Sequence, residues 1–116
     1  MKILLIVSLF LIFVSFLENE PGNLDDYYLL INQSNRHLYY GNFMEAKRDL
    51  DRAFEINGNP YYHDIYKMIF CNSKVKESRD NLKWLKKLVE DKNIHPKLVK
   101  FQLKGLLSKS ETAFLD

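Results

Sequence analysis

The helical periodicity of residues 42–58, a segment bounded by turn-forming residues, constrains the fold of this chain most strongly. Apolar side chains recur there at spacings that place them on one face of an α-helix: Phe43, Ala46, Leu50, Ala53 and Phe54. Gly41 precedes this segment and Gly58 ends it. Ala46 and Ala53 are small, and the distance between packed helix axes depends on the size of the side chains at the contact. The segment therefore predicts a helix against which a second, antiparallel helix packs closely.

Similar patterns predict four more helices, at about 23–40, 60–72, 76–91 and 95–108. Their predicted starts carry residues that favour helix N-termini: Asn23, Asn59, Pro60 and Pro96, with a capping box formed by Asn42 and Glu45 for the helix described above. The side chains predicted to face inward in the last two helices are Leu82, Leu85, Leu88, Val89, Val99, Leu103, Leu106 and Leu107. No segment alternates in the way of a β-strand, so we predict an all-α fold with short turns.

Residues 27–60 resemble the tetratricopeptide repeat (TPR), a 34-residue helix–turn–helix unit. Gly41-Asn42-Phe43 is similar to its central turn, and Gly58-Asn59-Pro60 is similar to its closing turn. Ala46, Leu50 and Ala53 resemble its small, large and small positions. A degenerate second unit at 61–95 follows with an offset of 35, which pairs Leu30 with Ile65, Ser34 with Ile69, Ala46 with Asn81, Leu50 with Leu85 and Ala53 with Leu88. The resemblance implies antiparallel helix hairpins stacked as a short TPR-like α-solenoid, closed by a C-terminal capping helix.

The first seventeen residues differ from the rest of the chain. One lysine is followed by fifteen apolar residues and serines, which would span roughly 22 Å as a helix and so fall short of a membrane core. A positive charge and a short apolar run are typical of a secretory signal, and we predict a signal peptide or N-terminal membrane anchor at 1–17. A polar linker follows at 18–24, then a helical domain at 25–108 and a C-terminal tail at 109–116. We therefore expect an exported protein of the cell envelope or a secreted one.

The resemblance also implies a binding surface, because the inner face of each first helix in a TPR lines a concave groove. On that face it places Tyr28, Ile31, Asn35, Leu38 and Tyr39 in the first repeat, and His63, Tyr66, Phe70, Ser73 and Lys74 in the second. The predicted partner-binding residues are Tyr28, Asn35, Tyr39, Tyr66, Phe70 and Lys74. An aromatic groove with scattered polar groups suits an extended or helical peptide. A small domain also needs large side chains for its core, so groove and core remain alternatives.

We predict a non-enzymatic protein–protein interaction module, a small exported TPR-like adaptor or assembly factor. The alternative is a structural protein whose aromatic face is buried in a homo-oligomer. His63-Asp64 is the only adjacent acid–base pair, and neighbours in a helix do not face each other, so no catalytic residue is expected. Cys71 and the three histidines lack metal-ligand spacing, so no metal or cofactor is expected.

Charge is distributed unevenly along the chain, with −4 over residues 18–60 and +5 over residues 61–116. Basic residues recur at helical spacings in the fourth predicted helix: Lys76, Arg79, Lys83, Lys86 and Lys87. We interpret them as a solvent-exposed helix face, and binding of phosphate or anionic lipid is the alternative. No nucleic-acid motif accompanies these lysines, so no nucleic acid is expected. Membrane contact is expected only through the N-terminal apolar segment.

Overall fold

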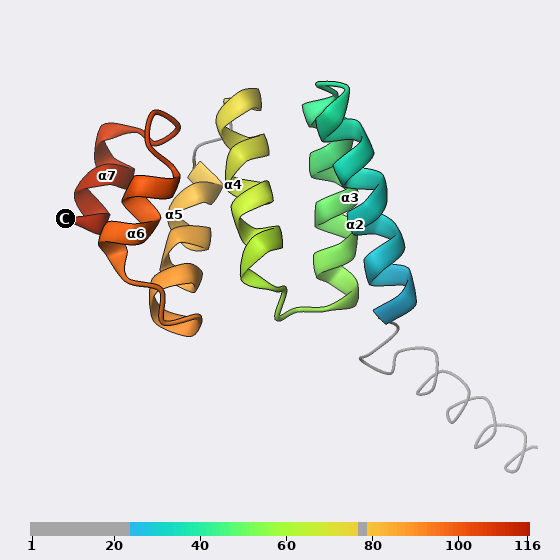
Figure 1. Ribbon diagram of the computed structural model, residues 1–116, viewed down its shortest axis with the longest axis horizontal. Helices are drawn as coiled ribbons and strands as arrows, with labels where there is room; N and C mark the ends of the chain where they lie inside the picture. Colours follow the sequence, from blue (N-terminus) through green and yellow to red (C-terminus); the bar gives the residue numbers. More distant parts are fainter. Residues whose placement is uncertain (1–23, 77–78) are drawn as a thin grey trace, which may run out of the picture.

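The computed structural model describes residues 24–76 and 79–116 (Figure 1). These residues form six α-helices and one π-helical segment: α2 (Leu24–Tyr39), α3 (Phe43–Ile56), α4 (Tyr62–Val75), α5 (Arg79–Lys86), η1 (Lys87–Asp91), α6 (Pro96–Gln102) and α7 (Lys109–Leu115). No strand occurs within the described ranges, so the all-α prediction is confirmed for them. The helices α2 to α5 pack one against the next along the chain, and α6 and α7 cover the outer side of α5 and η1.

The small residues of α3 lie in its contact with neighbouring helices, as the periodicity predicts. Ala46, Leu50 and Ala53 are fully buried, and so is Ser34 on the facing side of α2. The Ser34 hydroxyl donates to the carbonyl oxygen of Ile31 at 2.6 Å, so its polar atom is satisfied inside its own helix. Burying small side chains on both helices lets α2 and α3 approach closely along their length.

Two predicted helix starts differ from the structure. Gly41 does take the left-handed conformation, with φ of +76°, and turns the chain from α2 to α3. The Asn42 side chain makes no capping hydrogen bond, so the predicted capping box with Glu45 is not formed. The α4 helix begins at Tyr62 rather than at Pro60, because Tyr61 is extended and occupies the N-cap position; in the turn before it the Asn57 side chain accepts from the Asn59 amide.

The C-terminal part corrects the predicted domain limits. The fifth helix ends at Gln102 instead of Ser108, and turns at residues 103–106 include Gly105 with φ of +84°. Residues 109–116, predicted as a tail, instead contain α7, whose Glu111 and Leu115 are buried. The helical domain therefore continues through Leu115, because the Ser108–Glu111 capping box starts a new helix there.

Leu85 of α5 and Leu88 of η1 are buried as predicted, but the prediction for Leu82 is wrong. Leu82 is exposed, whereas Trp84 is buried beside Leu85 and packs against the ring of Phe54. The signal or anchor predicted at 1–17 lies outside the described residues, as does the linker predicted at 18–24 except for Leu24, which begins α2. Among residues 24–76 and 79–116, no helix is long and apolar enough to cross a membrane.

A buried polar network joins α4 to α5. The Asn72 side-chain amide donates to Asn81 Oδ1 at 3.1 Å, and the Asn81 amide donates to Ser73 Oγ at 3.4 Å. Asn72 and Asn81 are both fully buried. This interface therefore contains paired amides where the α2–α3 interface contains small side chains.

Candidate functional site

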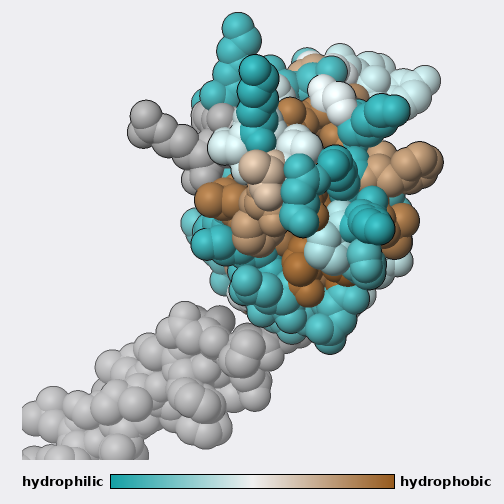
Figure 2. Space-filling model, turned by 90° about the vertical axis from the view of Figure 1, so that its left-hand side faces the viewer, coloured by the Kyte–Doolittle hydropathy of each residue, from teal (hydrophilic) through white to brown (hydrophobic). Residues whose placement is uncertain are grey.

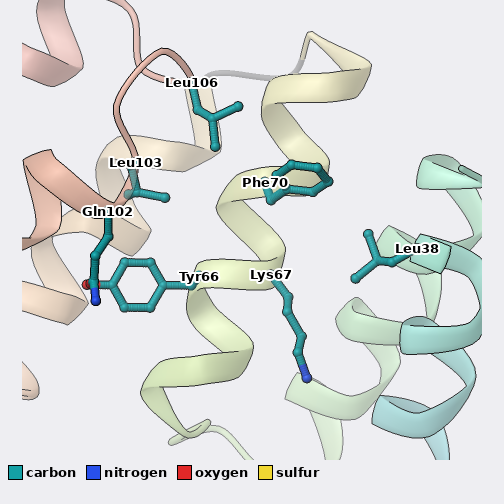
Figure 3. Close-up of a pocket in the computed structure, with 7 residues that line it drawn as sticks. All are labelled: Leu38, Tyr66, Lys67, Phe70, Gln102, Leu103 and Leu106. Carbon is teal, nitrogen blue, oxygen red and sulfur yellow. The ribbon is translucent and has the colours of Figure 1, made fainter.

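A cavity of about 430 Å³ opens on the face formed by α2, α4 and α6 (Figure 3). It is bordered by one residue of α2, three of α4 and three from the end of α6 and the turn after it: Leu38, Tyr66, Lys67, Phe70, Gln102, Leu103 and Leu106. These helices alternate along the chain with α3, α5 and α7, so the cavity joins residues more than sixty positions apart.

The spacing of the α4 residues explains why aromatic rings line this cavity. Tyr66 and Phe70 lie four positions apart and therefore project from the same side of the helix. Both are half-buried, and Tyr66 extends toward Gln102 and Leu103 while Leu38 borders the opposite side (Figure 3). The rings thus pack against the core and also form part of the cavity wall.

Lys67 is the charged residue that lines the cavity, and its ammonium group forms an ion pair with the carboxylate of Asp64. Lys67 Nζ lies 3.2 Å from Asp64 Oδ1, and the Tyr27 hydroxyl donates to Asp64 Oδ2 at 2.6 Å. Asp64 and Tyr27 are buried, and this burial, together with the hydrogen bond to Asp64, raises the pKa of Tyr27. The cation of Lys67 is therefore already paired, and the remaining cavity wall is mostly apolar.

The Tyr66 hydroxyl is the unusual polar group of this site. It is buried and has no hydrogen-bond partner among the residues that the structure describes. Burial raises the pKa of Tyr66, with the nearby Tyr62 adding to the effect, so the phenol remains neutral. A buried hydroxyl without a partner costs free energy relative to one that is hydrogen-bonded.

The structure separates the six predicted partner-binding residues into two groups. Tyr66 and Phe70 line the cavity, and Lys74, which does not line it, holds its ammonium over the Phe70 ring at 5.4 Å from the ring centre. The other three, Tyr28, Asn35 and Tyr39, do not line it.

These three residues are exposed elsewhere on α2. Tyr28 stacks on Tyr61, with 3.3 Å between the hydroxyl oxygens. Tyr39 is 84% exposed and contacts the Tyr40 ring. Leu38, which the resemblance also placed on the inner face, is the α2 residue that reaches the cavity.

No sequence pattern singled out Lys67 or Gln102 as site residues. In the sequence Lys67 is one of several charged residues of α4 and belongs to no motif. Gln102 lines the cavity because it is the last residue of α6. Leu103 and Leu106 were predicted as core residues of a longer helix. They line the cavity because the chain turns at residues 103–106. The Ser73 hydroxyl of α4 donates a hydrogen bond to the Leu106 carbonyl oxygen in this turn.

A second cavity, of about 540 Å³, lies between α3 and α5. Its wall combines acids of α3 with lysines and an indole of α5: Asp51, Phe54, Glu55, Gly58, Pro60, Lys83, Trp84 and Lys87. Lys83 Nζ lies 4.6 Å from the Trp84 ring centre. Within the described ranges no three His, Cys, Asp or Glu side chains gather as metal ligands. Because its wall carries both acidic and basic side chains, the second cavity is less apolar than the first.

Comparisons of the chain with protein-family models, curated proteins and solved structures find no match. The function is therefore inferred from the geometry of the cavity on α2, α4 and α6.

Proposed function

We propose that the helices form a TPR-like α-solenoid. The offset of 35 relates five residues of α2 and α3 to five of α4, α5 and η1, and all ten are buried. An offset of 34 from Ile65, Ile69 and Asn81 reaches Val99, Leu103 and Leu115, which are also buried. This periodic burial supports three successive hairpins, α2–α3, α4–α5 and α6–α7, with the last one shortened.

The proposed function is non-enzymatic binding of a protein or peptide through the cavity on α2, α4 and α6. The observation that carries it is an open, mainly apolar cavity lined by the first helix of each hairpin. Helical-repeat proteins use concave surfaces of this kind to bind partners. A volume of about 430 Å³ suits one or two large apolar side chains of a peptide. We assign no catalytic residue, metal or cofactor to it.

Binding can be tested with a peptide selected by phage display against the full chain. Leu38→Glu places a charge in the cavity wall and is expected to weaken binding at least about 30-fold, as loss of an interface anchor does. Tyr39→Ala, one residue along α2 but outside the cavity, is the matched control and should leave affinity unchanged. Fluorescence anisotropy measures both affinities, and circular dichroism verifies that both variants fold. Equal affinity of Leu38→Glu and wild type for every selected peptide would refute the assignment.

The location of the protein is part of the same proposal. The apolar segment at 1–17 supports export, as a cleaved signal or a retained anchor. Fractionation of cells that express the full chain should find it in the membrane or outside the cytoplasm. Recovery as a soluble cytoplasmic monomer would contradict this part of the proposal and leave the peptide-binding part standing.

A homo-oligomer is the second candidate function. The open apolar cavity and the strongly exposed Tyr39 and Tyr40 favour it, since a second copy can bury such surface. Light scattering coupled to size exclusion separates the candidates. A dimer that Leu38→Glu dissociates would favour the oligomer, and a monomer would favour the peptide-binding module.

A further inference from the structure

The α6 helix has an apolar residue on each of two opposite sides. Val99 and Leu103 are buried against the rest of the domain. Phe101 lies on the other side and is 76% exposed, with Leu98 48% exposed beside it. Phe101 and Leu98 lie about one helical turn apart, so together they form an exposed apolar patch on the outer side of α6.

Lysines surround this exposed ring. Lys97 precedes Phe101 by four residues on α6, and Lys104 follows it in the turn after α6, where the Lys104 amide donates to the Phe101 carbonyl oxygen at 3.4 Å; both lysines are exposed. Neither makes an ion pair with another group in the part of the chain that the structure describes, whereas Lys100 pairs with Asp116. Figure 2 views this end of the molecule and shows apolar surface interrupted by hydrophilic side chains.

We propose that Lys97, Leu98, Phe101 and Lys104, named here the α6 face, bind the surface of an anionic membrane. Phe101 and Leu98 insert at the boundary between headgroups and acyl chains, and the two ammonium groups contact anionic headgroups. Aromatic and aliphatic side chains flanked by lysines are the combination that such an interface binds. This contact goes beyond peptide binding, because none of the four residues lines the cavity on α2, α4 and α6.

A membrane fits this face better than an acidic protein does. The α6 face consists of protruding side chains and lines neither cavity of the domain. A protein partner would need a preformed pocket for Phe101, whereas a fluid bilayer accepts the ring without a matched shape. The unpaired charges of Lys97 and Lys104 provide the electrostatic attraction that an anionic bilayer requires.

The test uses the full chain, because its only tryptophan, Trp84, is buried and can be replaced. Phe101→Trp in a Trp84→Phe background reports the environment of the α6 face. Its emission is measured with phosphatidylcholine vesicles that carry brominated acyl chains, with and without phosphatidylserine. We expect quenching and a blue shift when phosphatidylserine is present, and loss of both signals as salt is raised.

Two further variants separate the α6 face from other membrane contacts. Leu29→Trp in the same background places the reporter on α2, where Leu29 is 56% exposed, and it should not be quenched. Lys97→Glu with Lys104→Glu should lower the affinity of the α6 face for anionic vesicles by roughly 25-fold or more, since each lysine near such a surface contributes about fivefold. If Trp84→Phe unfolds the chain, Phe101→Trp is placed in the wild type and read as the difference from Trp84 alone.

Three results would overturn the proposal. One is a Phe101→Trp reporter quenched no more than the Leu29→Trp reporter. Another is quenching that does not depend on phosphatidylserine, which indicates insertion by the apolar segment at 1–17 alone. The third is a spectral shift with polyglutamate but none with vesicles, which assigns the α6 face to an acidic protein. None of these results bears on the Leu38→Glu experiment.

Discussion

At the scale of single residues, side-chain size at the helix contacts follows most directly from the sequence. Ala46 and Ala53 are spaced by two turns on one face, and both are fully buried. Their role could be predicted because it depends only on helical periodicity and side-chain volume. The burial of Trp84 in place of Leu82 could not, since both positions are compatible with a helix face and tertiary packing selects between them.

Ala53→Leu is expected to lower the free energy of unfolding by about 1–3 kcal/mol, because it adds three carbons at a fully buried helix contact. Thermal unfolding followed by circular dichroism measures the effect. Arg52→Leu, at the exposed neighbouring position, should change the melting temperature little. An unchanged melting temperature in Ala53→Leu would show that this position is not at a close helix contact.

Cys71 gives a prediction of pH dependence. Burial raises the pKa of its thiol from 9.0 to about 11. A group with a raised pKa in the folded state contributes stability that is fully present below its unfolded pKa and is lost as pH rises through the folded one. Wild type should therefore lose more stability than Cys71→Ala between pH 9.0 and about pH 11. Urea titrations at the two pH values measure this, and equal losses would contradict the buried protonated thiol.

At the scale of elements, the helices from α2 to α6 were placed by the sequence, whereas the early end of α6 and the short helix α7 were not predicted. The centres of α2, α3 and α4 agree with the periodicity. The π-helical segment at Lys87–Asp91 changes the number of residues per turn, so a pattern based on 3.6 residues loses its phase there. The α7 helix has only seven residues, and its one clear sequence signal is Ser108 followed three positions later by Glu111.

Ser108→Ala is expected to destabilise the domain by about 0.5–2 kcal/mol, because it removes the side-chain oxygen that accepts from the Glu111 amide. Chemical denaturation measures the loss. Lys109→Ala, at the first position of α7, is the control and should be nearly neutral, since alanine is a good helix former. Equal stability of the two variants would indicate that α7 forms without its cap.

At the scale of the whole molecule, the cavity depends on how three hairpins are placed relative to one another. Tyr66 and Phe70 were predictable because both lie on α4 at helical spacing. Tyr28 and Tyr39 were predicted for the same face, yet only Leu38 of α2 reaches the cavity. Which α2 residue reaches the cavity depends on how α2 is rotated about its axis relative to α4. The apolar pattern of one helix does not specify that rotation.

A shortened chain that begins at Leu17 is expected to be soluble and helical, because the core is formed by residues between Tyr27 and Leu115. Its far-ultraviolet circular dichroism and its cooperative melting would verify this. Aggregation or loss of cooperative unfolding would show that the apolar segment at 1–17 belongs to the folded domain.

The buried pair Asn72 and Asn81 makes the α4–α5 hairpin chemically unlike the α2–α3 hairpin. If α4 packed against α3 in place of α5, the Asn72 amide would face an alanine and lose its hydrogen bond inside the protein. An unpaired buried amide costs about 1–3 kcal/mol, which is a large share of the stability of a small domain. We therefore expect the amide pair to favour packing of α4 against α5 over packing against any other helix of the domain.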